Sequence, residues 1–487
     1  MHNQQEIIKN ASSLIEEKKY LKAKDMMLNF LKNSHNIKIN IKFYYSLYLI
    51  FDGLKEPKNA KKYLEKCLKI NENNHIVINN LANIFLKEGN ILKAEKFYLK
   101  SINLKNDYLL AIINLAILYQ NLGRLEDSKK FYLKALDISP KRISIYFNLS
   151  RIDKDFIDKK KIDFLKNLMV NEENETSEMS YGYFLMAEFA RKNKDYNQEI
   201  DYLKKANEYS FDSKLKANKK TLNYWKNIIP LKFNKFIFEN DLKNHELINI
   251  KPIFIIGLPR SGSTVIEVLI SSGSKDILSL GESSIFNGII AKDFSNKDYN
   301  SIDLENMNNK ILEIFDNKNL NFKKNILLDK SLENFFYIDV ILRVFPKAIF
   351  INTTRNIEDN IFAIFKQSLG KLSWTNSIED ILNYIDNYLK VIKYFKNKYP
   401  DKIYSIELED LTNNVEEISK KLYSFCGLNW SEQVLNFYER KDLLVSTASN
   451  IQIRKNIYKY ENKKYEPYKN LLKNFLKKYD WLNKKKN

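Results

Sequence analysis

The segment IFIIGLPRSGSTVIEVLISS, residues 253–272, decides how the second half of this chain folds. The run PIFIIG (252–257) is short, apolar and rich in branched residues, which is typical of a buried parallel strand. The run TVIEVLISS (264–272) has the apolar spacing of a helix. The turn between them would present backbone N–H groups and the positive end of the helix dipole to an anion. The segment therefore predicts a strand, an anion-binding turn and a helix.

Strands and helices are predicted to alternate through the rest of this half. Three further apolar runs indicate strands: NILLD (325–329), KAIFINT (347–353) and KIYSIEL (402–408). Helical segments are expected at 333–345, 357–368 and 415–426. The alternation indicates an α/β domain with a parallel sheet, which we expect to span residues 251–487.

The turn is similar to the phosphate loop GxxxxGK[ST], with one difference. Gly257, Gly262 and Thr264 fit this pattern, but Ser263 stands where the lysine that pairs with β- and γ-phosphates is expected. Asp329 ends the one predicted strand with an acid that could hold magnesium. The sequence thus favours a P-loop-like turn that cradles a phosphate without engaging a γ-phosphate. A kinase or hydrolase remains a rival, and magnesium-dependent nucleotide turnover would identify it.

The first half of the chain repeats itself every 34 residues. At this offset one series of positions holds a large residue, Leu47, Leu81, Leu115 and Leu149. A second series holds a small residue, Ala60, Ala94 and Ser128. Small residues recur where two helices must touch. The pattern resembles the tetratricopeptide repeat, in which each unit is a helical hairpin that buries its apolar face against its neighbours. We expect a helical solenoid over residues 1–245, with its clearest repeats at 81–101 and 115–135.

Two roles are open for this solenoid. Its concave side would suit a peptide or another protein, as in other stacked repeats. Alternatively, the helices only brace or dimerise the second domain. The sequence does not separate the two.

Composition and charge exclude several classes of function. The formal net charge is +20, but the lysines are spread over the whole length, so we expect no nucleic-acid partner. No run approaches the roughly 20 apolar residues of a membrane span, and the first residues lack the apolar core of a signal peptide. We therefore expect a cytoplasmic protein. Cys67 and Cys426 lie far apart in the sequence and predict buried, reduced thiols rather than a disulfide or a metal site.

Scarce residue types narrow the chemistry further. Only nine of the 80 basic residues are arginines, and an arginine in so lysine-rich a chain indicates bidentate contact with an anion. All four histidines precede residue 250. Chemistry in the second half must therefore proceed without imidazole.

The anion-binding turn and the segments after it resemble the sulfotransferases. The similarity continues in order through LSLGESSIF (278–286), LLDKSLENF (327–335), LRVFPKAIFINTTR (342–355), LEDL (408–411), FCGLNW (425–430) and STASNIQIRKNIY (446–458). With the repeats, it looks like bacterial tetratricopeptide-repeat sulfotransferases related to the tyrosylprotein sulfotransferases. The resemblance implies transfer of a sulfuryl group from 3′-phosphoadenosine 5′-phosphosulfate (PAPS) to an acceptor hydroxyl, without a metal.

The same resemblance implies a donor site. The 5′-phosphate and the sulfate would be wrapped by Arg260, Ser261, Gly262, Ser263 and Thr264, and Arg355 would bind the 3′-phosphate. A segment with Ser449, Arg454 and Lys464 would fold over the donor.

The chain departs from the family pattern in two places. Ala363 stands where a serine that binds the 3′-phosphate is usual, so Thr354, Asn360 or a water would have to replace its hydrogen bond. Leu408 stands where relatives carry a tyrosine.

The resemblance also implies two catalytic residues. Glu282 would be the general base that takes the proton of the acceptor hydroxyl, and Lys330 would offset charge on the transferring group. A protein tyrosine, a glycan and a lipid headgroup remain open as acceptors, with a macromolecule favoured because of the repeats. The alternative is a decayed sulfotransferase that serves as a scaffold for protein partners.

Overall fold

The computed structural model describes residues 4–34, 38–171, 175–238, 251–274, 276–293, 303–317, 326–370, 372–439, 445, 447, 450–451, 453 and 465–482. By their contacts the residues divide into two compact units. The first holds 1–119, 126–140 and 311–320, and the second holds 120–125, 141–310 and 321–487.

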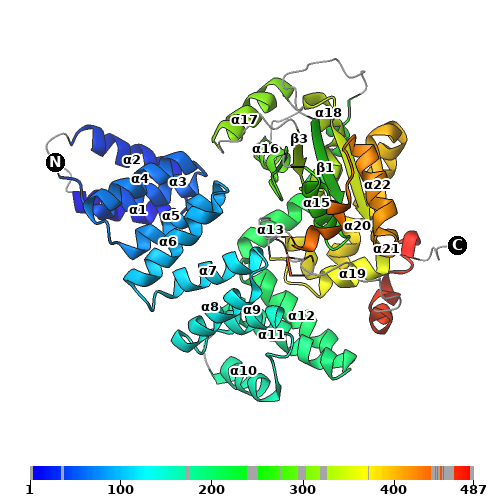
Figure 1. Cartoon of the computed structure of the whole chain (residues 1–487), viewed down its shortest axis with the longest axis horizontal. Coiled ribbons are helices and arrows are strands. Elements are labelled where there is room, and N and C mark those ends of the chain that lie inside the picture. Colours follow the sequence, from blue (N-terminus) through cyan, green and yellow to red (C-terminus); the bar gives the residue numbers. More distant parts are fainter. Residues whose placement is uncertain are drawn as a thin grey trace. The chain divides into compact units, whose positions relative to one another are not determined.

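Helical hairpins build most of the first unit. Its helices pair in chain order (Figure 1): α1 (Gln4–Glu16) with α2 (Tyr20–Lys32), α3 (Ile41–Gly53) with α4 (Pro57–Ile70), α5 (His75–Lys87) with α6 (Ile91–Leu104), and α7 (Leu109–Asn121) with α8 (Leu125–Ile138). Asparagines begin several of these helices. Asn40, Asn74 and Asn90 each accept a hydrogen bond from the backbone N–H three residues later, which satisfies a free donor of the first turn.

The 34-residue pattern corresponds to the packing between paired helices. Ala60, Ala94 and Ser128 are fully buried, and the hydroxyl of Ser128 donates to the carbonyl oxygen of Ala116 at 2.7 Å. Only small side chains allow the two helices of a hairpin to approach this closely. The predicted helical repeat is confirmed.

Helical hairpins continue into the second unit. The helices there are α9 (Ile143–Ile152), α10 (Lys159–Asn171), α11 (Thr176–Lys192) and α12 (Tyr196–Asp212), followed by α13 (Leu215–Asn223), the π-helix η1 (Tyr224–Ile228), α14 (Ile229–Lys232) and the 3₁₀ turn η2 (Phe233–Phe236). The last two hairpins therefore belong to the same compact unit as the α/β region. The predicted boundary between residues 245 and 251 falls largely outside the described residues and stays a prediction.

A five-stranded parallel sheet forms the centre of the second unit. Its strands are β1 (Lys251–Gly257), β2 (Ile277–Ser279), β3 (Ile326–Asp329), β4 (Ile349–Thr354) and β5 (Ile403–Glu407), in the spatial order β2-β3-β1-β4-β5. Between and after them lie α15 (Ser263–Ser272), α16 (Ile285–Asp293), α17 (Leu304–Asn317), the 3₁₀ helix η3 (Leu332–Tyr337), α18 (Ile338–Val344), α19 (Ile357–Phe365), α20 (Ile378–Lys398), α21 (Leu408–Asn413), α22 (Val415–Cys426) and the 3₁₀ segments η4 (Ser373–Asn376), η5 (Pro400–Lys402), η6 (Glu432–Glu439), η8 (Glu466–Phe475) and η9 (Asp480–Leu482).

Both faces of the sheet are covered, as a parallel sheet requires. On one face Ile253 and Ile255 of β1 pack in a buried cluster that includes Leu269 of α15 and Leu422 of α22. On the other face the ring of Phe254 lies 5.5 Å from that of Phe350, and Tyr388 of α20 donates to Asn352 at 2.8 Å. The continuous apolar run of β1 thus supplies side chains to both layers, and the predicted α/β fold with a parallel sheet is confirmed.

Gly257 holds the end of β1 against β4. Its φ is +136°, and a Cβ there would lie 2.5 Å from the backbone oxygen of Thr353. We expect Gly257→Ala to lower the free energy of unfolding by about 2 to 4 kcal/mol, through backbone strain and this overlap. Denaturant unfolding would measure the loss. The control is Gly288→Ala in α16, where a Cβ meets nothing within 4 Å and the helix gains up to about 1 kcal/mol. Equal stability of Gly257→Ala and the wild type would contradict this reading.

Candidate functional site

The predicted site residues of the loop 260–264, with Glu282, Lys330 and Arg355, follow the carboxyl ends of four neighbouring strands. The turn 257–264 follows β1, Glu282 lies three residues after β2, Lys330 follows β3 and Arg355 follows β4. In a parallel sheet these ends share one edge. After β1 the chain adds β2 and β3 on one side of it and then crosses to add β4 and β5 on the other side. Such a switch point forms a ligand crevice outside the strand ends. The topology therefore brings the loop, Arg355, Glu282 and Lys330 to one edge.

The turn after β1 has the shape of an anion-binding loop. Arg260 and Gly262 have φ values of +68° and +92°, and α15 begins at Ser263. Because α15, a ten-residue helix, starts directly after this turn, its first backbone amides lie at the same sheet edge as the end of β1. The hydroxyl of Ser261 is 2.6 Å from the carbonyl oxygen of Leu258 and 2.7 Å from Oγ1 of Thr353. Ser261 thus fastens the loop to β4, which its predicted role as a ligand hydroxyl did not anticipate.

Arg355 lies against this loop. Its Nη1 donates to the carbonyl oxygen of Arg260 at 3.3 Å, and Nδ2 of Asn360 donates to the carbonyl oxygen of Pro259 at 2.9 Å. Helix α19, which starts two residues after Arg355, is therefore tied to the loop at its first turns. Thr264 is buried, with its hydroxyl 3.2 Å from that of Thr447. The structure brings Arg355 and the loop together.

The two departures from the family pattern have structural counterparts. Ala363 is buried within α19, and the groups suggested to replace the lost serine bond to protein: Asn360 to Pro259, and the Thr354 hydroxyl to Ile406 at 3.3 Å. Leu408 packs beneath the loop, 2.8 Å from the position that a Cβ on Gly262 would take.

Three predicted donor residues cannot be placed. Ser449, Arg454 and Lys464 lie outside the described residues. Their roles stay predictions.

Lys330 is the centre of a charged cluster. Its Nζ lies 3.0 Å from Oε1 of Glu282 and 3.4 Å from Oε2 of Glu267. The side chain of Lys330 is 1% exposed and that of Glu267 is 12% exposed, whereas that of Glu282 is 51% exposed. One ammonium therefore links a buried carboxylate, that of Glu267, with a half-exposed one, that of Glu282.

Glu267 was missed by the sequence predictions. It is the single charged residue of TVIEVLISS, and it lies four residues after Ser263 on α15. Residues four apart share a helix face. An isolated acid in the apolar helix that follows the anion-binding turn was therefore the signal in the sequence that pointed to Glu267. Through Glu267, the helix that begins at the loop also holds Lys330.

The loop before Glu282 is fixed to β3 by backbone hydrogen bonds. The N–H of Leu280 donates to Leu328 at 2.8 Å, and the N–H of Lys330 donates to the carbonyl oxygen of Gly281 at 2.9 Å. These bonds place Glu282 beside Lys330.

Asp329, the residue predicted as a magnesium candidate, is buried. Its Oδ1 accepts from the N–H of Ser331 at 2.8 Å and from Asn334 at 3.0 Å, and its Oδ2 accepts from the Ser283 hydroxyl. This carboxylate therefore holds the turns after β2 and β3.

Opposing effects set the protonation of the cluster. Burial lowers the pKa of Lys330, but the carboxylates of Glu267 and Glu282 outweigh it and raise that pKa above its ordinary value. Burial raises the pKa of Glu267, and the Lys330 ammonium opposes this effect. Lys330 therefore stays protonated at neutral pH.

Asp359 makes the region near Arg355 sensitive to pH. Burial raises the pKa of Asp359 from 3.8 to about 6, against the opposing effect of Arg355. The folded chain therefore holds this proton more tightly than the unfolded chain between pH 4 and 6, so this contribution to stability falls as the pH rises through that window.

We expect Asp359→Asn to flatten the dependence of the melting temperature on pH between 4 and 6. It should also raise the melting temperature at pH 7, because the cost of the buried charge is removed. The exposed Asp401 gives the matched control, Asp401→Asn. An unchanged pH profile in Asp359→Asn would show that another group causes the dependence.

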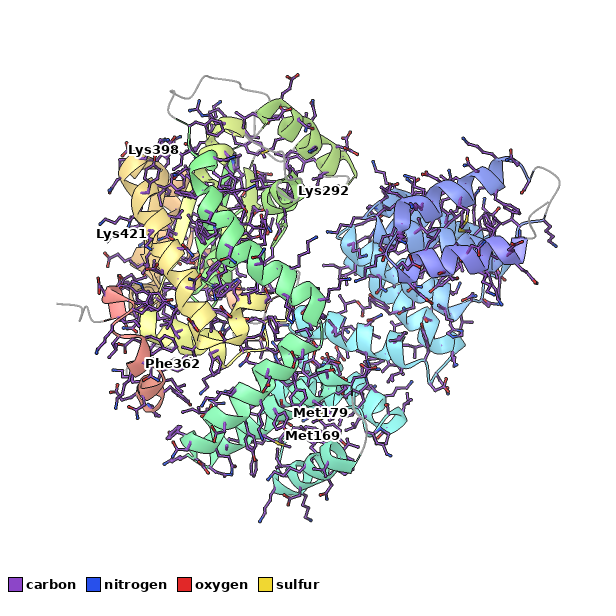
Figure 2. All side chains as sticks on the ribbon, turned by 180° about the vertical axis from the view of Figure 1, so that it is seen from behind. Met169, Met179, Lys292, Phe362, Lys398 and Lys421 are labelled. Carbon is purple, nitrogen blue, oxygen red and sulfur yellow. The ribbon has the colours of Figure 1, made fainter. Side chains whose placement is uncertain are left out.

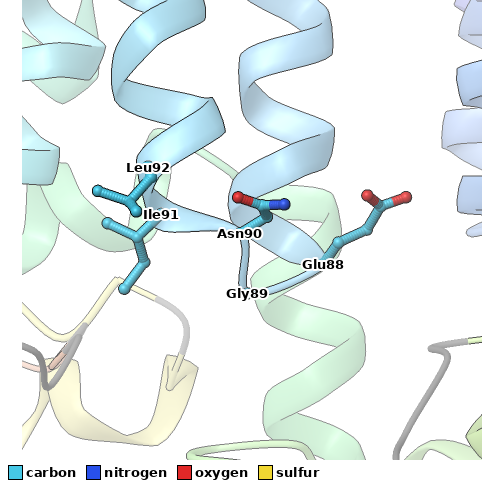
Figure 3. A pocket seen from close by; sticks show the side chains of 5 residues that line it. All are labelled: Glu88, Gly89, Asn90, Ile91 and Leu92. Atoms are coloured by element: carbon cyan, nitrogen blue, oxygen red, sulfur yellow. The ribbon is translucent and has the colours of Figure 1, made fainter.

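A shallow hollow lies at the turn between α5 and α6 (Figure 3). It has a volume of about 440 Å³ and is lined by Glu88, Gly89, Asn90, Ile91 and Leu92. The hollow belongs to the first unit and contains no predicted site residue. We assign it no role.

No helix in the described part of the chain combines the length and the apolar character that crossing a bilayer requires.

Known proteins match both halves of the chain. The model of the sulfotransferase family matches residues 252–432, and the tetratricopeptide repeat model matches residues 41–74, 77–108 and 110–142. An uncharacterized protein of Aquifex aeolicus is 26% identical over 314 residues, an alignment that covers 59% of this chain and 40% of that protein. The chain thus spans about 40% of the length of this curated relative.

Two solved sulfotransferase structures are also similar. The sulfotransferase domain of the Synechococcus PCC 7002 olefin synthase is 19% identical with a TM-score of 0.36, covering 47% of this chain and 91% of that one. Sulfotransferase STF1 from Mycobacterium tuberculosis is 12% identical with a TM-score of 0.29, covering 58% and 93%. The family matches confirm the predicted resemblance to sulfotransferases and to the tetratricopeptide repeat. The chain thus joins segments that match the tetratricopeptide repeat to a segment, residues 252–432, that matches the sulfotransferase family.

Proposed function

We propose that this chain transfers a sulfuryl group from PAPS to the hydroxyl of an acceptor. The observation that carries the proposal is the arrangement at the sheet edge. An anion-binding loop, the guanidinium of Arg355 and the pair of Glu282 and Lys330 follow four adjacent strands. The family match to residues 252–432 supports the same chemistry.

The loop and Arg355 would bind the donor. Ser263 and Thr264 begin α15, where a helix leaves backbone amides without an intrahelical acceptor, and such amides suit the 5′-phosphate and sulfate. The side chains of Arg260 and Arg355 would supply planar donors, and Arg355 is assigned to the 3′-phosphate. Positive φ values, as at Arg260 and Gly262, are typical of backbone nests whose successive N–H groups bind anions, which supports this assignment.

The acid–base chemistry would be done by Glu282 and Lys330. PAPS supplies a sulfuryl group whose bond to the 5′-phosphate oxygen breaks as a bond to the acceptor oxygen forms. The Glu282 carboxylate, half exposed, would take the proton of that hydroxyl. Lys330, held by Glu267, would stabilise the negative charge that develops on the bridging oxygen.

A macromolecule remains our preferred acceptor, with a protein tyrosine or a glycan as the first candidates. The tetratricopeptide repeats support this preference, since stacked repeats commonly bind proteins. The relation to tyrosylprotein sulfotransferases also stays a proposal. The cytoplasm stays our proposed location for the protein.

Calorimetric titration with 3′-phosphoadenosine 5′-phosphate, the product nucleotide, tests this proposal. The wild type should bind it, and Arg355→Gln should weaken binding about 10- to 100-fold, since a hydrogen bond to a charged group contributes about 1.5 to 3 kcal/mol. The control is Arg142→Gln, because Arg142 is 40% exposed just before α9 and lies 4.0 Å from Glu178. Absence of any binding heat in the wild type would refute the enzyme and leave the scaffold.

A further inference from the structure

The carboxyl end of helix α19 is held by helix α12 of the last hairpin. Glu199 in the first turn of α12 is 1% exposed, and its Oε1 lies 2.6 Å from Nζ of Lys366, the residue after α19. Two turns further along α12, Nδ2 of Asn207 donates to the carbonyl oxygen of Phe365 at 3.0 Å. A cation and a donor are favourable there, because the last carbonyls of a helix lack partners.

Tyr468 completes this buried cluster. Its hydroxyl donates to Oε2 of Glu199 at 2.6 Å, and Lys366 contacts the same hydroxyl, with Nζ 4.1 Å from the ring centroid. Burial raises the pKa of Tyr468, and the hydrogen bond to Glu199 raises it further, so the hydroxyl stays protonated. Both oxygens of Glu199 are therefore used. We call Glu199, Lys366 and Tyr468 the anchor cluster.

From the anchor cluster a chain of ring contacts leads to Arg355. Tyr465, three residues before Tyr468, stacks on Phe362 of α19 with ring centroids 6.2 Å apart. Figure 2 labels Phe362 near the C-terminal segment. The guanidinium carbon of Arg355 lies 5.5 Å from the centroid of Tyr465, a distance at which cation and ring attract. The ring of Tyr465 thus orients Arg355, and Tyr468 fixes the segment that carries this ring.

We propose that Glu199 is a positioning residue for Arg355, acting through Tyr468 and Tyr465. The last helical hairpin would then support the nucleotide site in addition to any role in docking. This inference rests on the proposed function, because it takes Arg355 to bind the donor.

The first test changes the ring beneath Arg355 in the full chain. In calorimetric titrations with 3′-phosphoadenosine 5′-phosphate, Tyr465→Leu should bind about 5- to 10-fold more weakly than the wild type. Tyr465→Phe keeps the ring face and should bind within about twofold of the wild type. Thermal unfolding of both variants is the check on stability. If the loss of affinity only reflected damage to the fold, it would correlate with a lower melting temperature and not with removal of the ring.

The second test breaks the anchor cluster without leaving a buried charge. The double variant Glu199→Leu with Lys366→Met removes both charges at similar volume, so the chain should stay folded. Its nucleotide affinity should still fall about 3- to 10-fold, through looser placement of the ring. When Tyr465→Leu is added to this double variant, the total fold-loss of affinity should be smaller than the product of the two separate fold-losses, because both changes act through one contact.

A surface contact of the same C-terminal segment gives the control. Glu379 pairs with Lys478 at 2.9 Å, and both side chains are 54% exposed. Glu379→Gln should leave the affinity unchanged.

Two outcomes would overturn the inference alone. The first is wild-type nucleotide affinity in both Tyr465→Leu and the double variant. The second is a triple variant whose loss of affinity equals the product of the separate losses. A wild type that binds no nucleotide would refute the proposed function and this inference together.

Discussion

Replacing Glu282 by Gln should lower the turnover number for sulfuryl transfer about 10²- to 10⁴-fold, the usual contribution of a positioned general base. Gln keeps the shape and can still accept a hydrogen bond from Lys330, which lies 3.0 Å away. It cannot accept the proton of an acceptor hydroxyl. Initial rates with labelled PAPS, measured over tyrosine peptides, glycans and lipids, would show the loss. The Michaelis constant for the donor should change by less than about twofold, since the variant retains the anion loop.

The control for this prediction is an exposed glutamate elsewhere in the same unit. Glu417 on α22 is 61% exposed and pairs only with Lys421 among its described contacts. Glu417→Gln should transfer at the wild-type rate. Undiminished transfer by Glu282→Gln would show that another group takes the proton.

Replacing Lys330 by Met should have two large effects. The turnover number should fall about 10²- to 10³-fold, the typical loss when one group that stabilises developing charge is removed. The free energy of unfolding should also fall by about 3 to 5 kcal/mol, because Glu267 is left buried without its ammonium partner. Kinetics at saturating donor and denaturant unfolding would measure the two effects separately.

A second variant separates catalysis from stability. Combining Lys330→Met with Glu267→Leu removes the buried carboxylate as well and should restore most of the lost stability. The turnover number should stay low, because the developing charge still lacks a cation. Recovery of both quantities would mean that Lys330 acts only on the fold.

The strands of the sheet were largely predictable because each central strand is a continuous apolar run. The runs 252–257, 325–329, 347–353 and 402–408 all became strands within two residues of the predicted bounds. The strand β2 was not predicted, since Ile277–Ser279 is too short to show a period. The amphipathic helix α20, Ile378–Lys398, carried a clear helical pattern that the prediction left out.

The candidate site was predictable only where a motif and a strand end coincide. Glu282 and Lys330 were chosen separately from their motifs, and the sheet order places their charged groups 3.0 Å apart. The isolated acid in an apolar helix marks Glu267 as unusual, but its partner Lys330 lies 63 positions away in the sequence, so no local pattern could pair the two. The anchor cluster could not be foreseen for the same reason. Glu199 and Tyr468 are separated by 269 residues.

A crystal structure with bound 3′-phosphoadenosine 5′-phosphate tests the central claim most directly. We predict that the 5′-phosphate lies within hydrogen-bond distance of the amides of residues 261–264, with the 3′-phosphate on Arg355. Nucleotide bound elsewhere, or a loop closed by the protein's own side chains at saturating nucleotide, would contradict the account.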